Sequence, residues 1–293
     1  MNFSKARVSM VCELCRKEKD VKDSHVIPKF VVKWLKDTSA TGYVRQAEKP
    51  NIRKQDIDTR RLLCDSCEGM LSRFETLFAN RIFLPFQNEG LKEFEYEEWL
   101  QTFAVSVFWR LGVSDLDDFR SFKPHLTCHL EKALEIWRRA LLSGDYSTDV
   151  YDHHILFLDY VKSTGVDLPD GFHKYMLRSV DATVMANAKE VFIYIKLPGI
   201  ILLSGVKPAD PEGWQGTKIE KQGKVKAGGQ EVKLRGFGEF LVHRAQTIAW
   251  NLESISDKQT KRIAETVERD LDWMFRSDTL KADLADERLK KRK

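Results

Sequence analysis

The chain has 293 residues, of which 42% are hydrophobic and 31% are charged. A chain of this size and composition can bury a core and is expected to form two or three soluble domains. No run approaches the roughly 18 consecutive apolar residues of a membrane span, and the first ten residues lack the apolar segment of a signal peptide. We therefore expect a cytoplasmic protein with no membrane partner.

The net charge of +4 is unevenly distributed. Residues 1–81 contain 17 Lys/Arg and 11 Asp/Glu, a balance of +6, so the remaining residues sum to −2. Contact with nucleic-acid phosphates requires positive charge of this kind. Ordinary surface solubility is the other interpretation.

The N-terminal segment begins with a tight metal-binding turn, VCELC, and a short β element at SHVIPKF. A short helical pattern, VVKWLKD, and a polar stretch follow. From Cys64 onward, apolar residues recur every three or four positions, which predicts a helix with Cys67 in its first turn.

Beyond Pro85 the pattern is mainly helical. Residues 96–112 and 124–144 each have an apolar stripe, and Gly112 and Gly144 are predicted to end these helices. The aromatic residues on the stripes are expected in the core; they are Trp99, Phe103, Phe108, Trp109 and Trp137.

The C-terminal half begins with β-rich runs at 155–206, which predict a sheet with a turn at Pro198-Gly199. Hairpins and a loop are expected over 207–238. Helices are then predicted at 240–253 and 257–277, before a charged tail that ends in LKKRK.

These patterns predict an α+β fold with three parts. Residues 1–85 form a zinc module, residues 86–150 a helical region, and residues 151–293 an antiparallel β-rich domain with C-terminal helices.

Four of the five cysteines form two CxxC pairs, Cys12/Cys15 and Cys64/Cys67. Zinc favours four soft or borderline ligands in a tetrahedron, with sulfur at about 2.3 Å. In a reducing compartment this pattern predicts one structural Zn²⁺ rather than disulfides. The alternative is two unrelated pairs of buried cysteines. Cys128 is left over and is expected to be buried or half-buried.

The elements CELC, SHVIP and LLCDSCEGMLSRFE together resemble the four-cysteine, zinc-bound, treble-clef branch of the HNH endonucleases. The resemblance covers residues 12 to about 80. It implies that His25 is the general base of phosphodiester cleavage, aided by a catalytic Mg²⁺ or Mn²⁺. It also implies a DNA or, less favourably, an RNA substrate, and a role in bacterial antiviral defence or in mobile elements.

The sequence departs from the family pattern at three positions. Ser24 stands where the family usually has Asp or Glu, and Glu68 where Asn or His follows the second cysteine pair. Leu71 stands three residues further on, where the family often has His, Asn or Lys. We expect Glu68 to take part in catalysis at His25. Asp23 and Glu75 are further candidate carboxylates for the divalent ion.

Basic residues of the same segment are candidate phosphate contacts. They are Lys29, Lys33, Arg45, Arg60, Arg61 and Arg73. Two other interpretations stand beside the nuclease. One is a non-catalytic zinc module that binds nucleic acid or a protein partner; the other is a zinc staple beside a ligand-sensing sheet. A homodimer or a regulatory protein partner is compatible with each.

Histidines outside the N-terminal segment suggest a second metal site at His153, His154 and His129, although a paired histidine before an apolar run is more often a strand-entry feature. No Ser/His/Asp or Cys/His pattern in the sequence indicates a nucleophilic hydrolase.

Overall fold

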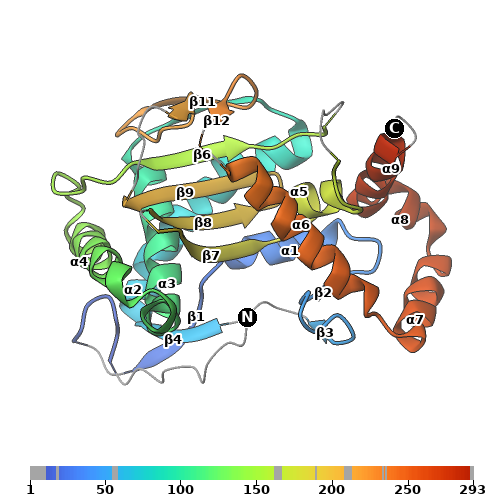
Figure 1. Cartoon of the computed structure of the whole chain (residues 1–293), viewed down its shortest axis with the longest axis horizontal. Coiled ribbons are helices and arrows are strands. Elements are labelled where there is room, and N and C mark those ends of the chain that lie inside the picture. Colours follow the sequence, from blue (N-terminus) through green and yellow to red (C-terminus); the bar gives the residue numbers. More distant parts are fainter. Residues whose placement is uncertain are drawn as a thin grey trace.

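A computed structural model gives the structure of the chain and describes residues 11–17, 20–54, 59–161, 167–188, 190–207, 213–232, 234 and 236–290. The fold is α+β, as predicted. A four-stranded antiparallel sheet with strand order β6-β9-β8-β7 lies at its centre, with helices on both faces (Figure 1). Its strands are β6 (His153–Phe157), β7 (Asp181–Ala186), β8 (Val191–Leu197) and β9 (Ile200–Lys207).

The central strands form because their sequences are apolar on both sides. All seven residues of β8 and the first seven of β9 are buried. The turn between them is Pro198-Gly199, as predicted, and Gly199 has a φ of 68°, a conformation that favours glycine. Such doubly buried strands need a helical layer on each face.

One face of the sheet packs against α3 (Glu98–Phe122) and α4 (Thr127–Ser143). The other face carries Tyr194 and Leu203, which cluster with Phe237 at the start of α6 (Phe237–Glu253). The aromatic stripes of α3 and α4 are buried, as expected.

The predicted end of a helix at Gly112 is wrong, because α3 continues to Phe122. A Cβ at Gly112 would lie 2.6 Å from Cδ2 of Leu134 and 3.3 Å from Cδ1 of Ile193. The glycine therefore allows α3 to approach α4 and the sheet closely. Gly144 does end α4, with a left-handed φ of 74°.

The N-terminal module is built on β1 (Val21–His25), which pairs antiparallel with β4 (Thr59–Cys64). Helix α2 (Asp65–Phe78) follows β4 directly, with Cys67 in its first turn as predicted. An insertion separates the two strands along the chain. It contains α1 (Lys29–Asp37), β2 (Val44–Arg45) and β3 (Arg53–Lys54).

Shorter elements connect these parts. They are η1 (Ala79–Phe83), η2 (Pro85–Glu89), β5 (Glu93–Tyr96), η3 (Pro124–Leu126), α5 (Phe172–Arg178), β10 (Trp214–Gln215), β11 (Gly223–Lys226) and β12 (Glu231–Val232). Strand β5 pairs with β11, and β10 pairs with β12.

The C-terminal helices differ from the prediction. The single helix expected at 257–277 is two helices, α7 (Asp257–Glu268) and α8 (Leu271–Arg276). They separate because Asp270 caps α8, its carboxylate accepting a hydrogen bond from the backbone N–H of Trp273 at 2.9 Å. The charged tail is helical as far as Lys290, in α9 (Asp278–Lys290).

The largest buried cluster contains residues from all three predicted segments, from Cys12 to Val225. The C-terminal helices contribute little to it, and no residue of α7 or α8 is buried. In the part of the chain that the structure describes, every helix is too short or too polar to cross a bilayer.

A group of buried polar side chains lies between the sheet and α6. Asp181 accepts hydrogen bonds from the Arg244 guanidinium and, at 2.9 Å, from the Tyr175 hydroxyl. Lys196 is fully buried, and its ammonium donates to the carbonyl of Ser179 at 2.6 Å. Burial lowers the pKa of Lys196 to about 7, although Asp181 acts in the opposite direction.

The lowered pKa of Lys196 predicts that the free energy of unfolding depends on pH. Between pH 7 and 10 the unfolded state binds more protons at this side chain than the folded state, so the free energy of unfolding rises with pH. Relative to Lys196→Met, the slope should approach about 1.4 kcal/mol per pH unit. Urea unfolding of both proteins at pH 7, 8 and 9 measures it, and a pH-independent difference would contradict the assignment.

Candidate metal centre

The four cysteines of the two CxxC pairs converge at one point. Their sulfurs all lie within 4.8 Å of one another, and the Sγ atoms of Cys15 and Cys64 are 3.9 Å apart. Sulfurs at 2.3 Å from a tetrahedral zinc ion are separated by about 3.8 Å. The geometry therefore fits a four-thiolate metal site, and zinc is the ion that this donor set favours.

Local backbone structure places each pair. The first pair lies on a tight turn in which the N–H of Arg16 donates to the carbonyl of Cys12 at 2.8 Å, with Arg16 at a positive φ of 58°. The backbone N–H of Glu13 donates a hydrogen bond to the carbonyl of Leu62 at 2.8 Å, which attaches this turn to β4. The second pair spans the end of β4 and the start of α2, where the helix dipole favours thiolate charge.

The cluster is largely buried, since Cys12, Cys64 and Cys67 are at most 6% exposed. Burial raises the pKa of Cys12 and Cys67, so a bound cation is what would hold these sulfurs as thiolates. Four protein ligands leave no open position for water, which makes the site structural rather than catalytic. Cys128 is exposed, so the expectation that it is buried or half-buried is wrong.

A network of charged side chains on α4 supports the turn. Arg138 donates to the carbonyl of Leu14 at 3.0 Å, and Glu135 accepts from Arg138 and from Arg16, each at 2.9 Å. These contacts, Arg138 foremost, lower the pKa of Glu135 to about 2. The turn is therefore fixed to the helical layer as well as to β4.

His25 lies at the far end of β1 from the cysteines, opposite Thr59 of β4, and is half-buried. Its backbone carbonyl accepts a hydrogen bond at 2.8 Å from Nη1 of Arg110, a residue of α3 that is only 1% exposed. Nη2 of Arg110 lies 2.6 Å from Oε1 of Glu75 on α2. One buried cation thus ties β1 and α2 to α3, and it neutralises the Glu75 carboxylate.

The positions at which the family pattern has metal ligands are mostly closed to solvent. Ser24 is fully buried and Leu71 is 1% exposed, so neither faces an open site. Glu68 is half-buried, and its Oε2 has no hydrogen-bond partner in the described part of the chain. Asp23 is exposed. Among the described residues, the four cysteines are the one group of three or more His, Cys, Asp or Glu ligands, and no such group surrounds His25.

Helix α3 brings further charged residues to this module. The charges of Arg60 and Asp118 both act on Asp115. Arg60 lies opposite Ser24 in the β1–β4 pair. Burial, more than Asp118, raises the pKa of Asp115 to about 6. The sequence patterns missed both Arg110 and Asp115. For Arg110 the available signal was a charged side chain within an apolar helical run, whereas Asp115 lies in an acidic stretch that gave no such signal.

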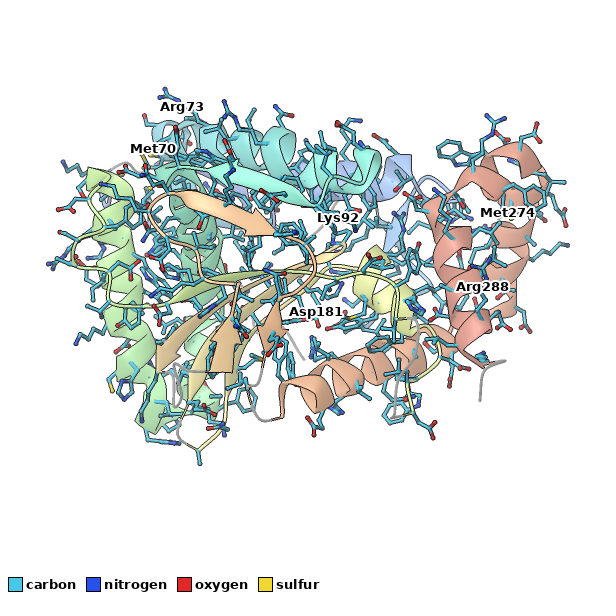
Figure 2. The ribbon with its side chains drawn as sticks, turned by 90° about the horizontal axis from the view of Figure 1, so that it is seen from above. Met70, Arg73, Lys92, Asp181, Met274 and Arg288 are labelled. Atoms are coloured by element: carbon cyan, nitrogen blue, oxygen red, sulfur yellow. The ribbon has the colours of Figure 1, made fainter. Side chains whose placement is uncertain are left out.

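The predicted phosphate contacts have different surroundings. Lys29 and Arg73 are exposed, and Arg73 lies on the outer side of α2, away from the sheet (Figure 2). Lys33 pairs with Asp37, and Arg61 donates to the carbonyl of Val21 at 2.8 Å. Arg45 and Arg60 are half-buried; Arg45 reaches Gln259, and Arg60 lies opposite Ser24. Within the described part of the chain, Lys29 and Arg73 are thus the exposed members of the set that have neither an ion pair nor a side-chain hydrogen bond.

The histidines of β6 take part in packing. His153 bonds to Asp149 at 2.8 Å and to Ser204 at 2.9 Å. This Asp-His-Ser chain was not evident in the sequence, but Ser204 is 0% and His153 2% exposed, so no substrate reaches it. His154 stacks on Trp214 and bonds to Thr217 at 2.9 Å. No metal-ligand group in the described residues includes either histidine.

Comparison of the chain with protein-family models, with curated proteins and with solved structures gave no match.

The metal site predicts about one zinc ion per chain. Cys64→Ser removes one of four ligands and should lose most of this zinc and lower the melting temperature. Cys128→Ser is the matched control, because Cys128 lies outside the cluster, and it should keep both. Elemental analysis and thermal unfolding measure the two effects, and full zinc retention by Cys64→Ser would contradict the four-thiolate site.

The Arg110 contacts predict a stability effect. Glu75→Gln leaves the Arg110 charge buried without its counter-ion and should lower the free energy of unfolding by about 3 kcal/mol. Glu131→Gln is the control, because its ion pair with Arg120 is about half exposed and should contribute less than about 1 kcal/mol. Equal effects of the two substitutions in urea unfolding would show that Arg110 does not depend on Glu75.

Proposed function

We propose that this protein hydrolyses phosphodiester bonds of DNA, or less favourably of RNA, with His25 as the general base. The observation that carries the proposal is the place of His25. His25 is the last residue of β1, which pairs antiparallel with β4, and β4 runs directly into α2. Four converging cysteines lie at the other end of this strand pair. A cytoplasmic setting, in which the thiols stay reduced, belongs to the same proposal.

In the proposed reaction, the His25 imidazole accepts a proton from the water that attacks the phosphorus atom. The bond from phosphorus to the leaving ester oxygen breaks, and that oxygen takes a proton from solvent. Imidazole suits this step because it gains and loses protons near neutral pH. Arg110 donates a hydrogen bond to the backbone carbonyl of His25. The imidazole ring is therefore attached to a backbone position that is fixed to α3. Zinc on the cysteines would supply rigidity and no open coordination position.

The expected catalytic Mg²⁺ or Mn²⁺ has weaker support. Ser24 and Leu71 are buried, and Arg110 already neutralises Glu75. The residues around His25 therefore do not form a ready set of oxygen ligands, and we assign no reaction step to a divalent ion. Glu68 stays a proposed catalytic residue because its carboxylate has an unpartnered oxygen among the described residues. Its support is weaker than that of His25, since Glu68 lies in the first turn of α2, at the cysteine end of the strand pair.

The same observations favour a second candidate, a zinc module that binds nucleic acid or a protein partner without cutting it. A module of this kind needs the zinc scaffold and exposed cations such as Lys29 and Arg73, but no ligands for a catalytic ion. Salt-dependent retention of DNA without cleavage, in every metal tested, would support this candidate over the nuclease.

The cleavage assay compares the wild-type protein with His25→Ala on supercoiled plasmid and on RNA, with Mg²⁺, with Mn²⁺ and without an added divalent ion. Loss of a general base should slow cleavage by about 10²- to 10⁴-fold. His243→Ala, at an exposed position on α6, is the control and should cleave at the wild-type rate. Equal cleavage by wild type and by His25→Ala with unchanged zinc content would reject His25 as the base.

A further inference from the structure

The β2–β3 hairpin of the insertion lies against the start of α7, although the two are some 200 residues apart. Nδ2 of Asn51 donates to the carbonyl of Ser254 at 3.0 Å, and the N–H of Ser256 donates back to Oδ1 of Asn51 at 2.8 Å. Nη2 of Arg45 reaches Oε1 of Gln259 at 3.4 Å. The hairpin and α7 therefore form one continuous surface.

Six cations gather on this surface, which we call the basic surface. They are Arg45, Lys49 and Arg53 of the hairpin and Lys258, Lys261 and Arg262 of α7. Residues 44–53 and 256–262 contain only two acidic residues, Glu48 and Asp257. None of the six cations has an ion pair with a carboxylate in the described part of the chain.

Two of the hairpin cations lie at positions that lower the stability of the β2–β3 strand pair. Arg45 and Arg53 are direct partners across the two strands, and both guanidinium groups lie over the ring of Tyr43, at 5.4 and 4.2 Å from its centroid. Like charges directly opposite each other destabilise a strand pair. The repulsion is relieved when an anion lies between them.

The cations of α7 also lie at positions where they destabilise their own helix. Lys258, Lys261 and Arg262 have the i, i+3, i+4 spacing of one helix face and lie in the first two turns. The N-terminal end of a helix is the positive end of its dipole, where cations are unfavourable and phosphate groups are favoured. Within the described ranges of the chain, both halves of the basic surface thus hold cations at unfavourable positions and without a carboxylate partner.

An exposed aromatic side chain lies beside this surface. Trp250 is 59% exposed on α6, one helical turn before Ser254, the residue that Asn51 contacts. Cations that follow a backbone, together with an aromatic ring that stacks on a base, are the combination by which proteins hold nucleic-acid strands.

We propose that the basic surface binds the sugar–phosphate backbone of a nucleic acid, with Trp250 stacking on an unpaired base. The choice of a nucleic acid as the polyanion rests on the proposed function. In Figure 1 the hairpin and the β1–β4 pair lie at the same lower edge of the molecule, below the central sheet, so a nucleic acid on the basic surface is on the side of the protein that carries His25.

The test measures the affinity of the full chain for fluorescein-labelled DNA and RNA, single- and double-stranded, over a series of salt concentrations. All proteins carry His25→Ala, so that probes stay intact. The test variant combines Arg53→Gln, Lys258→Gln, Lys261→Gln and Arg262→Gln. Its dissociation constant should rise at least about tenfold at 100 mM salt, and its log–log salt slope should fall by about 3.

The control removes four exposed cations elsewhere, by Lys132→Gln, Arg139→Gln, Lys221→Gln and Lys224→Gln, and should bind as its parent does. Trp250→Ala should weaken binding of the single-stranded probes more than of the duplexes. An unchanged affinity and salt slope in the test variant, or an equal loss in the control, would overturn the inference.

Failure of this inference and failure of the proposed function give different results. If the wild-type protein cuts nucleic acid and the test variant binds normally, the nuclease stands and the basic surface is rejected. If no protein cuts but the test variant loses binding, the basic surface stands and cleavage at His25 is rejected.

Discussion

The buried guanidinium of Arg110 connects the N-terminal module to the rest of the protein. A cation that is 1% exposed must find its partners where it lies. Helix α3 takes these partners from two other elements, the carboxylate of Glu75 on α2 and the carbonyl of His25 on β1. Because α3 also packs against the central sheet, the position of His25 depends on the core of the whole chain.

The cysteines constrain the other end of the same strand pair. Cys64 is opposite Val21, whereas His25 is opposite Thr59, so the metal cluster and the histidine are separated by about 13 Å along β1. A zinc ion on the cysteines would be too far away to touch a phosphate group held at His25. It would fix the register of β1 and β4, while Arg110 fixes the end at which chemistry is proposed.

Features that depend on neighbouring residues could be predicted from the sequence. The CxxC turns, the start of α2 at Cys64, the end of α4 at Gly144 and the Pro198-Gly199 turn each follow from a few adjacent side chains. Features that depend on distant residues could not. Gly112 has the sequence pattern of a helix end, but only its contact with Leu134 shows why the helix continues.

The site near His25 shows the same limit. The sequence predicted a β element over residues 24–30, which includes His25, but the strand is Val21–His25 and α1 begins at Lys29. Only the part of the predicted element up to His25 is therefore right. The sequence also held no sign that Arg110, in an apolar helical run, would reach the backbone of His25. The burial of Ser24 and Leu71 could not be predicted from the sequence either. Whether a short strand or one face of a helix is buried depends on the element that packs over it, and here that element is α3.

The hydrogen bonds between the insertion and the C-terminal helices have a consequence for how the protein is made. Trp273 donates to the carbonyl of Ser39 at 2.9 Å, and the N–H of Asp278 donates to Thr38 at 3.1 Å. These contacts join residues more than 230 positions apart, so they form only after residues 273–278 have left the ribosome. Long-range closure of this kind slows folding and comes late. During translation, the segment that carries the cysteines and His25 is therefore made long before the residues that hold its insertion in place.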